Sequence, residues 1–156
     1  MKARLIAAGT RLPAWINEGF QEYQKRLRQP LTLELVEVPV AQRRPGEPPQ
    51  RAMAREGEIM LAAIGREDHV GALEVEGRPF STPQLSTWLG ERLRAAQPLV
   101  LLVGGPDGLA EDCRQRANQA WSLSPLTLPH GLVRVVVAEQ LYRAMSLAAG
   151  HPYHRA

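Results

Sequence analysis

Apolar and polar residues follow one another along this chain in blocks that predict strands and helices in alternation. Short apolar or alternating runs predict strands at residues 4–8, 31–38, 70–75, 99–103 and 121–124. The run at 99–103 is wholly apolar, which is typical of a strand that is buried on both faces.

Apolar residues at helical spacing predict helices at residues 13–29, 51–64, 82–97, 109–119 and 132–149. We expect Trp15 and Ile59 on buried helix faces, and Thr82 as the N-cap of the third helix. The last helix begins with strand-like valines, but its later apolar residues and the spacing of Glu139 and Arg143 favour a helix. This alternation predicts an α/β fold, with a mainly parallel sheet flanked by helices.

A glycine turn, residues 104–108, follows the wholly apolar strand. Ligands of open α/β sheets bind outside the carboxyl ends of the strands, so this turn is a candidate binding site. It lacks the lysine and hydroxyl of a phosphate loop, and its glycine spacing differs from that of dinucleotide-binding proteins. A purely structural turn at the end of a strand is the alternative.

A second candidate is the segment 122–130, in which small hydroxyl residues, apolar residues and two prolines precede the last helix. Prolines fix the backbone and remove donors, so such a segment is rigid and leaves backbone groups free for a flat heterocycle such as adenine. A connection that only packs is the alternative. If the segment binds a ligand, we expect it to share one pocket with the glycine turn.

The C-terminal segment 151–155 concentrates two imidazoles, a tyrosine and a guanidinium, which a frayed end does not require. Imidazole moves protons near neutral pH, and tyrosine and arginine contact bases and phosphates. A metal site at His151 and His154 is disfavoured, because no third ligand has suitable spacing.

Charge and cysteine content bear on the possible partners and on the cellular compartment. The net charge is +3, and all basic residues except Lys2 and Lys25 are arginines. This permits a nucleic-acid partner, although compositional bias explains it equally well. The proline-rich basic segment 40–50 predicts a mobile loop, solvated or in contact with RNA. Cys113 is the only cysteine, and the sequence has neither an apolar run of membrane-spanning length nor a signal peptide. We therefore expect a single cytoplasmic domain over residues 1–156.

Several segments considered together resemble one known family. They are residues 9–10 (GT), 102–108 (LVGGPDG), 121–124 (WSLS), 126–130 (LTLPH), 132–134 (LVR), 139–144 (EQLYRA) and 151–155 (HPYHR). This combination, which covers the whole chain, resembles the RlmH family of SPOUT-class methyltransferases. The resemblance implies an α/β fold with a C-terminal deep trefoil knot, a homodimer and S-adenosyl-L-methionine as cofactor. It also implies methylation of a pseudouridine at ring nitrogen 3, in a stem-loop of 23S ribosomal RNA within the assembled ribosome.

The resemblance also implies site residues. The cofactor would contact the end of a strand, the glycine turn and the proline-containing loop, at Leu73, Gly105, Ser124, Pro125, Leu126, Thr127, Leu128 and Pro129. For catalysis we expect His154 as the base and Tyr153 to orient the target ring, with Arg143 and Arg155 stabilising the anion or holding phosphate. Further phosphate contacts are expected from the basic loop and from Arg4, Arg11, Arg26 and Arg28.

Two other functions stay open from the residues alone. One is a ribosome- or RNA-binding module without activity, which the tail and the loops would serve equally well. The other is a nucleotide-binding protein that uses the glycine turn for a different ligand.

Overall fold

A five-stranded sheet, in which all paired strands are parallel, forms the centre of the computed structural model, which describes residues 1–155. The strand order is β2-β1-β4-β3-β5. The strands are β1 (Lys2–Ala8), β2 (Thr32–Val38), β3 (His69–Pro79), β4 (Leu99–Val103) and β5 (Gln119–Ser122). The predicted α/β fold with a parallel sheet is therefore confirmed.

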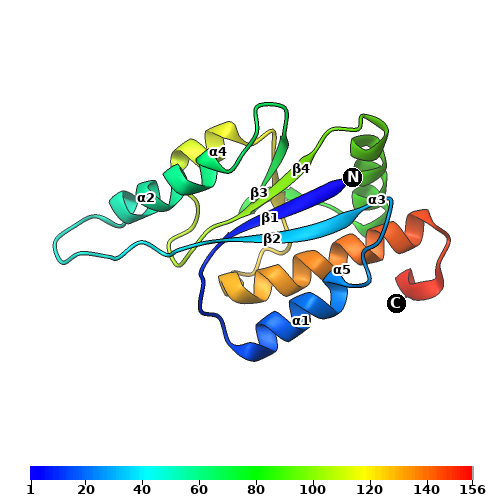
Figure 1. The fold of residues 1–156 in the computed structure, drawn as a ribbon, viewed down its shortest axis with the longest axis horizontal. Coiled ribbons are helices and arrows are strands. Elements are labelled where there is room, and N and C mark those ends of the chain that lie inside the picture. Colours follow the sequence, from blue (N-terminus) through cyan, green and yellow to red (C-terminus); the bar gives the residue numbers. More distant parts are fainter. Residues whose placement is uncertain (156) are drawn as a thin grey trace.

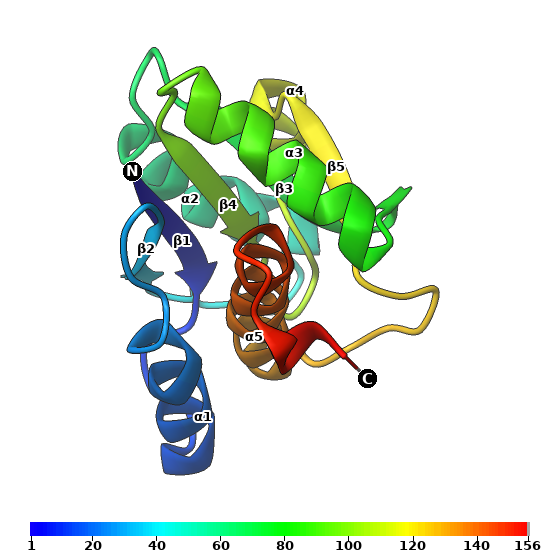
Figure 2. The same cartoon turned by 90° about the vertical axis from the view of Figure 1, so that its right-hand side faces the viewer.

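Helices cover both faces of the sheet (Figure 1). One face carries α1 (Ala14–Gln24), α3 (Thr82–Arg94) and α5 (His130–Ala148), and the other carries α2 (Pro49–Ala62) and α4 (Glu111–Arg116). A short 3₁₀ turn, η1 (Pro152–His154), follows α5. Figure 2 shows α5 nearly end-on, with this last segment folded back beside its C-terminal end.

The core divides at the sheet because side chains alternate between its faces. Every residue of β4 is buried. Leu99 and Leu101 belong to the core beneath α1, α3 and α5, whereas Val100 and Leu102 belong to the core beneath α2 and α4. The strand that precedes the glycine turn is thus fixed from both sides.

The N-cap of α3 is Ser81, so the prediction of Thr82 was wrong. The Ser81 hydroxyl accepts from the Gln84 amide at 3.2 Å, and the Gln84 side chain accepts from the Ser81 amide at 2.8 Å. This reciprocal pair is a capping box, which requires a glutamine or glutamate three residues after the cap.

The helix predicted at 109–119 is shorter, because the chain turns early into β5. The Asn118 amide donates to the Val70 carbonyl, and the Asn118 side-chain oxygen accepts from the Val70 amide, both at 2.8 Å. These bonds join the chain to β3, so β5 begins at Gln119, before the predicted start at residue 121.

Two residues expected on buried faces are exposed. Trp15 is 59% exposed and Ile59 is 49% exposed. In each case the next residue, Ile16 or Met60, occupies the buried position. In α2 the buried face also contains Glu56, a carboxylate that no hydrophobic pattern marks. The predicted irregular segment is also shorter than expected, since α2 begins at Pro49 and proline is tolerated in the first turn of a helix.

Candidate functional site: a cavity and a C-terminal cluster

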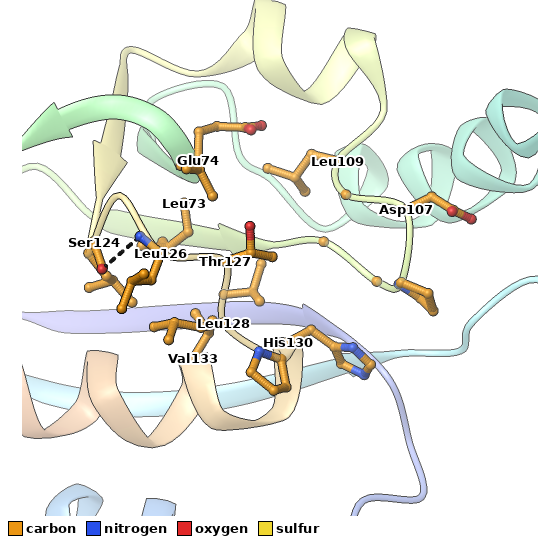
Figure 3. Close-up of a pocket in the computed structure, with 18 of the residues that line it drawn as sticks. Leu73, Glu74, Asp107, Leu109, Ser124, Leu126, Thr127, Leu128, His130 and Val133 are labelled. Carbon is orange, nitrogen blue, oxygen red and sulfur yellow. Dashed lines mark hydrogen bonds between the residues drawn. The ribbon is translucent and has the colours of Figure 1, made fainter.

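A cavity of about 570 Å³ opens beyond the carboxyl ends of β4 and β5, beside residues 73–75 in the middle of β3 (Figure 3). β3 lies between β4 and β5 in the sheet, so the ends of β4 and β5 flank this part of β3. The segments that follow β4 and β5 form the cavity wall, and the first turns of α5 close it with His130 and Val133. This volume is within the range of small-molecule sites in proteins.

Most residues predicted to bind the cofactor lie in this cavity. They are Leu73, Gly105, Ser124, Leu126, Thr127, Leu128 and Pro129. Pro125 is exposed and is not among the lining residues. The structure thus brings together the glycine turn and the segment 122–130, which are far apart in the sequence.

The glycine turn is too tight for side chains at its first position. A Cβ atom on Gly104 would lie 2.4 Å from the Gly108 carbonyl carbon. Gly108 has a φ of +90°, which favours glycine, and its amide donates to the Gly105 carbonyl at 3.1 Å. The glycines therefore fix the shape of this part of the wall.

The loop between β5 and α5 is organised by its own serines. The Ser122 hydroxyl donates to the Ser124 carbonyl at 3.1 Å, and the Ser124 hydroxyl accepts from the Leu126 amide at 2.9 Å. Within residues 1–155, the amides of Thr127 and Leu128 have no hydrogen-bond acceptor. These donors belong to residues that line the cavity, and they remain for a ligand.

The rest of the wall is mainly apolar, with two carboxylates beside it. Leu73, Leu109 and Leu128 line the cavity, Glu74 is bonded to Arg114 at 3.0 Å, and Asp107 faces Arg43. Among these residues, Glu74 and Leu109 were missed from the sequence. Glu74 directly follows Leu73, a residue that the family resemblance implied, so this adjacency was the available clue.

His130 is the titratable group of the cavity that belongs to α5. Burial lowers its pKa below the usual value of 6.5, and the nearby Arg134 guanidinium lowers it further, while Glu56 acts in the opposite direction. Arg134 is fully buried and donates to the carbonyls of Ala8 and Gly9 and to Glu37. The imidazole is therefore neutral at pH 7.

The predicted catalytic residues form a separate cluster. Glu139 Oε1 accepts from Arg143 Nε at 2.9 Å and Nη2 at 2.6 Å, and from the Tyr153 hydroxyl at 3.1 Å. The Arg143 guanidinium lies 5.1 Å from the Tyr153 ring centroid, and Tyr142 packs edge-on against that ring at 4.6 Å. Burial raises the pKa of Tyr153, and hydrogen bonding to Tyr23 and the Glu139 charge raise it further. Tyr153 therefore acts as a donor.

The cavity involves the first turns of α5, whereas the cluster involves the second half of that helix and the segment that follows it. Val133 lines the cavity, whereas Arg143 lies ten residues later in the same helix, about 15 Å along its axis. His154 is half-buried and Arg155 is exposed, and neither lines the cavity. One chain therefore does not bring the two predicted sets of residues together.

Some arginines expected to contact phosphate are engaged elsewhere. Arg4 pairs with buried Asp68 and donates to the Ala63 carbonyl, so the prediction that it is free for phosphate was wrong. Arg26 pairs with Glu22 at 2.6 Å. Arg11 and Arg28 are exposed.

Neither a metal centre nor a membrane span is found in the part of the chain that the structure describes. No three His, Cys, Asp or Glu residues between 1 and 155 are grouped to hold a metal ion. Over the same residues, no helix has the length and apolar character needed to cross a membrane.

Comparison with known proteins gives full-length relatives. Residues 1–154 match the family described as "Predicted SPOUT methyltransferase". The ribosomal RNA large subunit methyltransferase H of Alkalilimnicola ehrlichii is 54% identical over 156 residues, which is 100% of each chain. The protein of the same name from Hahella chejuensis is 52% identical over 155 residues, 99% of each chain.

Two solved structures share the fold at low sequence identity. A probable methyltransferase from Bordetella pertussis has a TM-score of 0.57 at 16% identity, with 92% of this chain and 95% of that chain covered. A putative methylase family protein from Neisseria gonorrhoeae has a TM-score of 0.53 at 15% identity, with 90% and 81% covered.

Proposed function

The chain belongs to the RlmH family of SPOUT methyltransferases, and from this premise we propose that it methylates ribosomal RNA with S-adenosylmethionine as methyl donor. The proposed target is ring nitrogen 3 of a pseudouridine in a stem-loop of 23S ribosomal RNA, on the assembled ribosome. The observation that carries the proposal is the cavity, where residues 73–75 of β3, the glycine turn and the loop after β5 meet.

The cavity residues fit this donor. Adenine is a flat heterocycle, which suits the apolar wall of Leu73, Leu109 and Leu128 and the unpartnered amides of the loop after β5. The donor also carries an ammonium group and ribose hydroxyls, for which Asp107 and Glu74 supply carboxylate acceptors beside the wall. Gly104 and Gly105, in the turn after β4, line the cavity with backbone atoms alone.

S-adenosylmethionine, when bound, supplies an electrophilic methyl group on a sulfonium. This chain must hold the target nitrogen in line with that methyl group, which is chiefly a matter of position. The ring nitrogen of pseudouridine is protonated near neutral pH, so a group must accept its proton. We assign this role to His154, with Tyr153 donating a hydrogen bond that orients the ring. Arg143 and Arg155 stabilise the negative charge that develops on the ring.

The separation between the cavity and the C-terminal cluster supports the proposal of a homodimer. Within one chain, the cavity and the cluster lie about 15 Å apart along α5. In a symmetric dimer, the tail of one chain reaches the cavity of the other, and two composite sites form. We propose this arrangement, with the whole of residues 1–156 as one domain in the cytoplasm.

A trefoil knot is also proposed for the C-terminal half. Its support is the path of the chain, which leaves the sheet edge at β5 and returns through the loop 123–129 to pack α5 against α1 and α3 over the middle of the sheet. A trefoil knot is an exception to the rule that chains do not thread through their own loops.

Calorimetric titration with S-adenosylmethionine tests the proposed function. We expect saturable binding with one site per chain, and weakened binding when Leu73 is replaced by tryptophan to fill the cavity. The matched control is Val36→Ala, on a strand remote from the cavity wall. Absence of saturable binding by the folded protein would favour an RNA-binding module without activity or a binder of another nucleotide.

A further inference from the structure

We propose that Arg43 is a positioning residue for the donor cavity, which ties the basic loop to the glycine turn through Asp107 and Glu56. The basic loop is defined here as residues 39–48, between β2 and α2. The role in donor binding rests on the proposed function, whereas the mechanical link between loop and turn does not.

Glu56 supplies the first part of the link. It is 2% exposed, and its carboxylate accepts from Arg43 Nη1 and from the Ala41 amide, the latter at 2.9 Å. A buried carboxylate requires a cation or several donors to offset its lost hydration. Arg43 and the Ala41 amide therefore supply the donors that offset the lost hydration of the Glu56 carboxylate.

Asp107 supplies the second part. Arg43 Nε donates to Asp107 Oδ2 at 3.1 Å, and Nη2 lies 3.0 Å from the same oxygen. Arg43 Nη1 also donates to the Ala41 carbonyl at 2.8 Å. Hydrogen bonding to Glu56 raises the pKa of Arg43, so the guanidinium stays charged. A planar group with five donors serves both carboxylates at once, which a lysine ammonium on a flexible stem does not.

The same pair of carboxylates brackets the glycine turn. Asp107 lies within the turn and lines the cavity, and Glu56 lies behind it, 3.3 Å from where a Cβ atom on Gly105 would stand. The position of the turn against the cavity therefore depends on Arg43, although Arg43 itself does not line the cavity.

A second arginine holds the same loop without touching the turn. Arg55 Nη1 donates to Glu47 at 2.6 Å, and Nη2 donates to the Gln42 carbonyl at 2.7 Å. Arg55 thus provides a matched control, because its loss loosens the basic loop and leaves the contacts of Asp107 and Glu56 in place.

The test compares Arg43→Lys, Arg43→Gln and Arg55→Gln in the full-length protein. Hydrogen–deuterium exchange of residues 104–109, measured without ligand, should rise in both Arg43 variants and stay at the wild-type level in Arg55→Gln. The dissociation constant for S-adenosylmethionine should rise by about tenfold in the Arg43 variants and by less than about twofold in Arg55→Gln. Arg43→Lys keeps a cation beside Glu56, so the thermal midpoint of this variant should stay near that of the wild type. A loss of affinity in this variant would then come from the position of the turn and not from unfolding.

A double-mutant cycle tests whether Arg43 acts through Asp107. We expect Asp107→Asn to weaken binding, and Arg43→Lys to add little in the double variant, because the same contact is already lost. Fully additive effects, or wild-type exchange and affinity in Arg43→Lys, would overturn the proposal. If the wild-type protein binds no S-adenosylmethionine, the proposed function fails, and the exchange measurement alone still decides whether Arg43 controls the turn.

Discussion

The Tyr153 hydroxyl donates a hydrogen bond to Glu139 Oε1 at 3.1 Å, so the C-terminal tail is fixed to the α5 of its own chain. Arg143 donates to the same carboxylate oxygen, and the three side chains form one unit. The tail is therefore ordered before any partner is present, at the end of α5 that is remote from the cavity. Under the proposed function, these residues would act on the cavity of a second chain.

Mixed dimers should reveal whether tail and cavity come from different chains. His154→Ala removes the tail base, and Leu73→Trp fills the cavity, so each variant alone should be inactive. Mixed in equal amounts and allowed to exchange, they should regain about a quarter of wild-type turnover, because half of the dimers are mixed and each has one intact composite site.

The control is each variant mixed with itself under the same conditions. A site built within a single chain leaves every mixed dimer without an intact site, so no recovery of turnover would contradict the shared arrangement.

His154→Ala by itself should separate chemistry from binding. We expect turnover to fall by about a hundredfold or more, since this is the usual contribution of a general base. The affinity for S-adenosylmethionine should stay at the wild-type value, because the proposed role of His154 is toward the target ring and not toward the donor. Turnover measured under saturating donor, together with calorimetry, checks both parts. Full turnover with normal binding would remove His154 from the mechanism.

Gly104→Ala should destabilise the protein and abolish donor binding. The added Cβ would lie 2.4 Å from the Gly108 carbonyl carbon, so the turn must shift, at a cost of about 3 kcal/mol in the free energy of unfolding. Gly90→Ala is the matched control, because its Cβ would meet only the Arg94 side chain at 3.5 Å. Within helix α3 it should stabilise by about 0.5–1 kcal/mol, and denaturant titration measures both variants. Equal stability of the two variants would contradict the packing of the turn.

Protein stability should fall as the pH drops below about 6.5 because of His69. Burial lowers the pKa of His69 from its usual 6.5, and Arg92 and Arg116 lower it further. The unfolded chain then takes up a proton that the folded chain does not, so the stabilising contribution is complete above pH 6.5 and declines below it.

The Arg92 Nη1 group donates to His69 Nδ1 at 3.1 Å, so protonation at Nδ1 breaks this bond. His69→Asn keeps an acceptor without the titration. Thermal midpoints between pH 7.5 and 5.5 should therefore change less in this variant than in the wild type. An identical pH dependence would exclude His69 as the source, with His130 as the other imidazole whose pKa is lowered.

Local patterns were sufficient for the α/β class and for two parts of the cavity wall, the glycine turn and the segment 122–130, whereas Leu73 required the family resemblance. Alternating apolar residues located the strands, and strand ends marked by Gly105 and Ser124 meet at one edge because parallel neighbours end together. The catalytic assignment required the family resemblance as well, since no spacing rule connects Tyr153 with Glu139.

Other features depend on contacts that no local pattern encodes. Glu56 occupies a buried helix position because Arg43 reaches it from a neighbouring loop. Asn118 ends α4 because it bonds to Val70, a residue in another strand. Both interactions join distant parts of the chain, so hydrophobic periodicity, which is a local property, predicted neither.

Methyl transfer to ribosomal subunits tests the central claim most directly. Large subunits with and without the target pseudouridine would be incubated with the protein and S-adenosylmethionine labelled on its methyl group. We expect label in 23S ribosomal RNA, at ring nitrogen 3 of the pseudouridine, and only background label where uridine stands in its place. No incorporation into either subunit, or equal incorporation into both, would contradict the proposed activity.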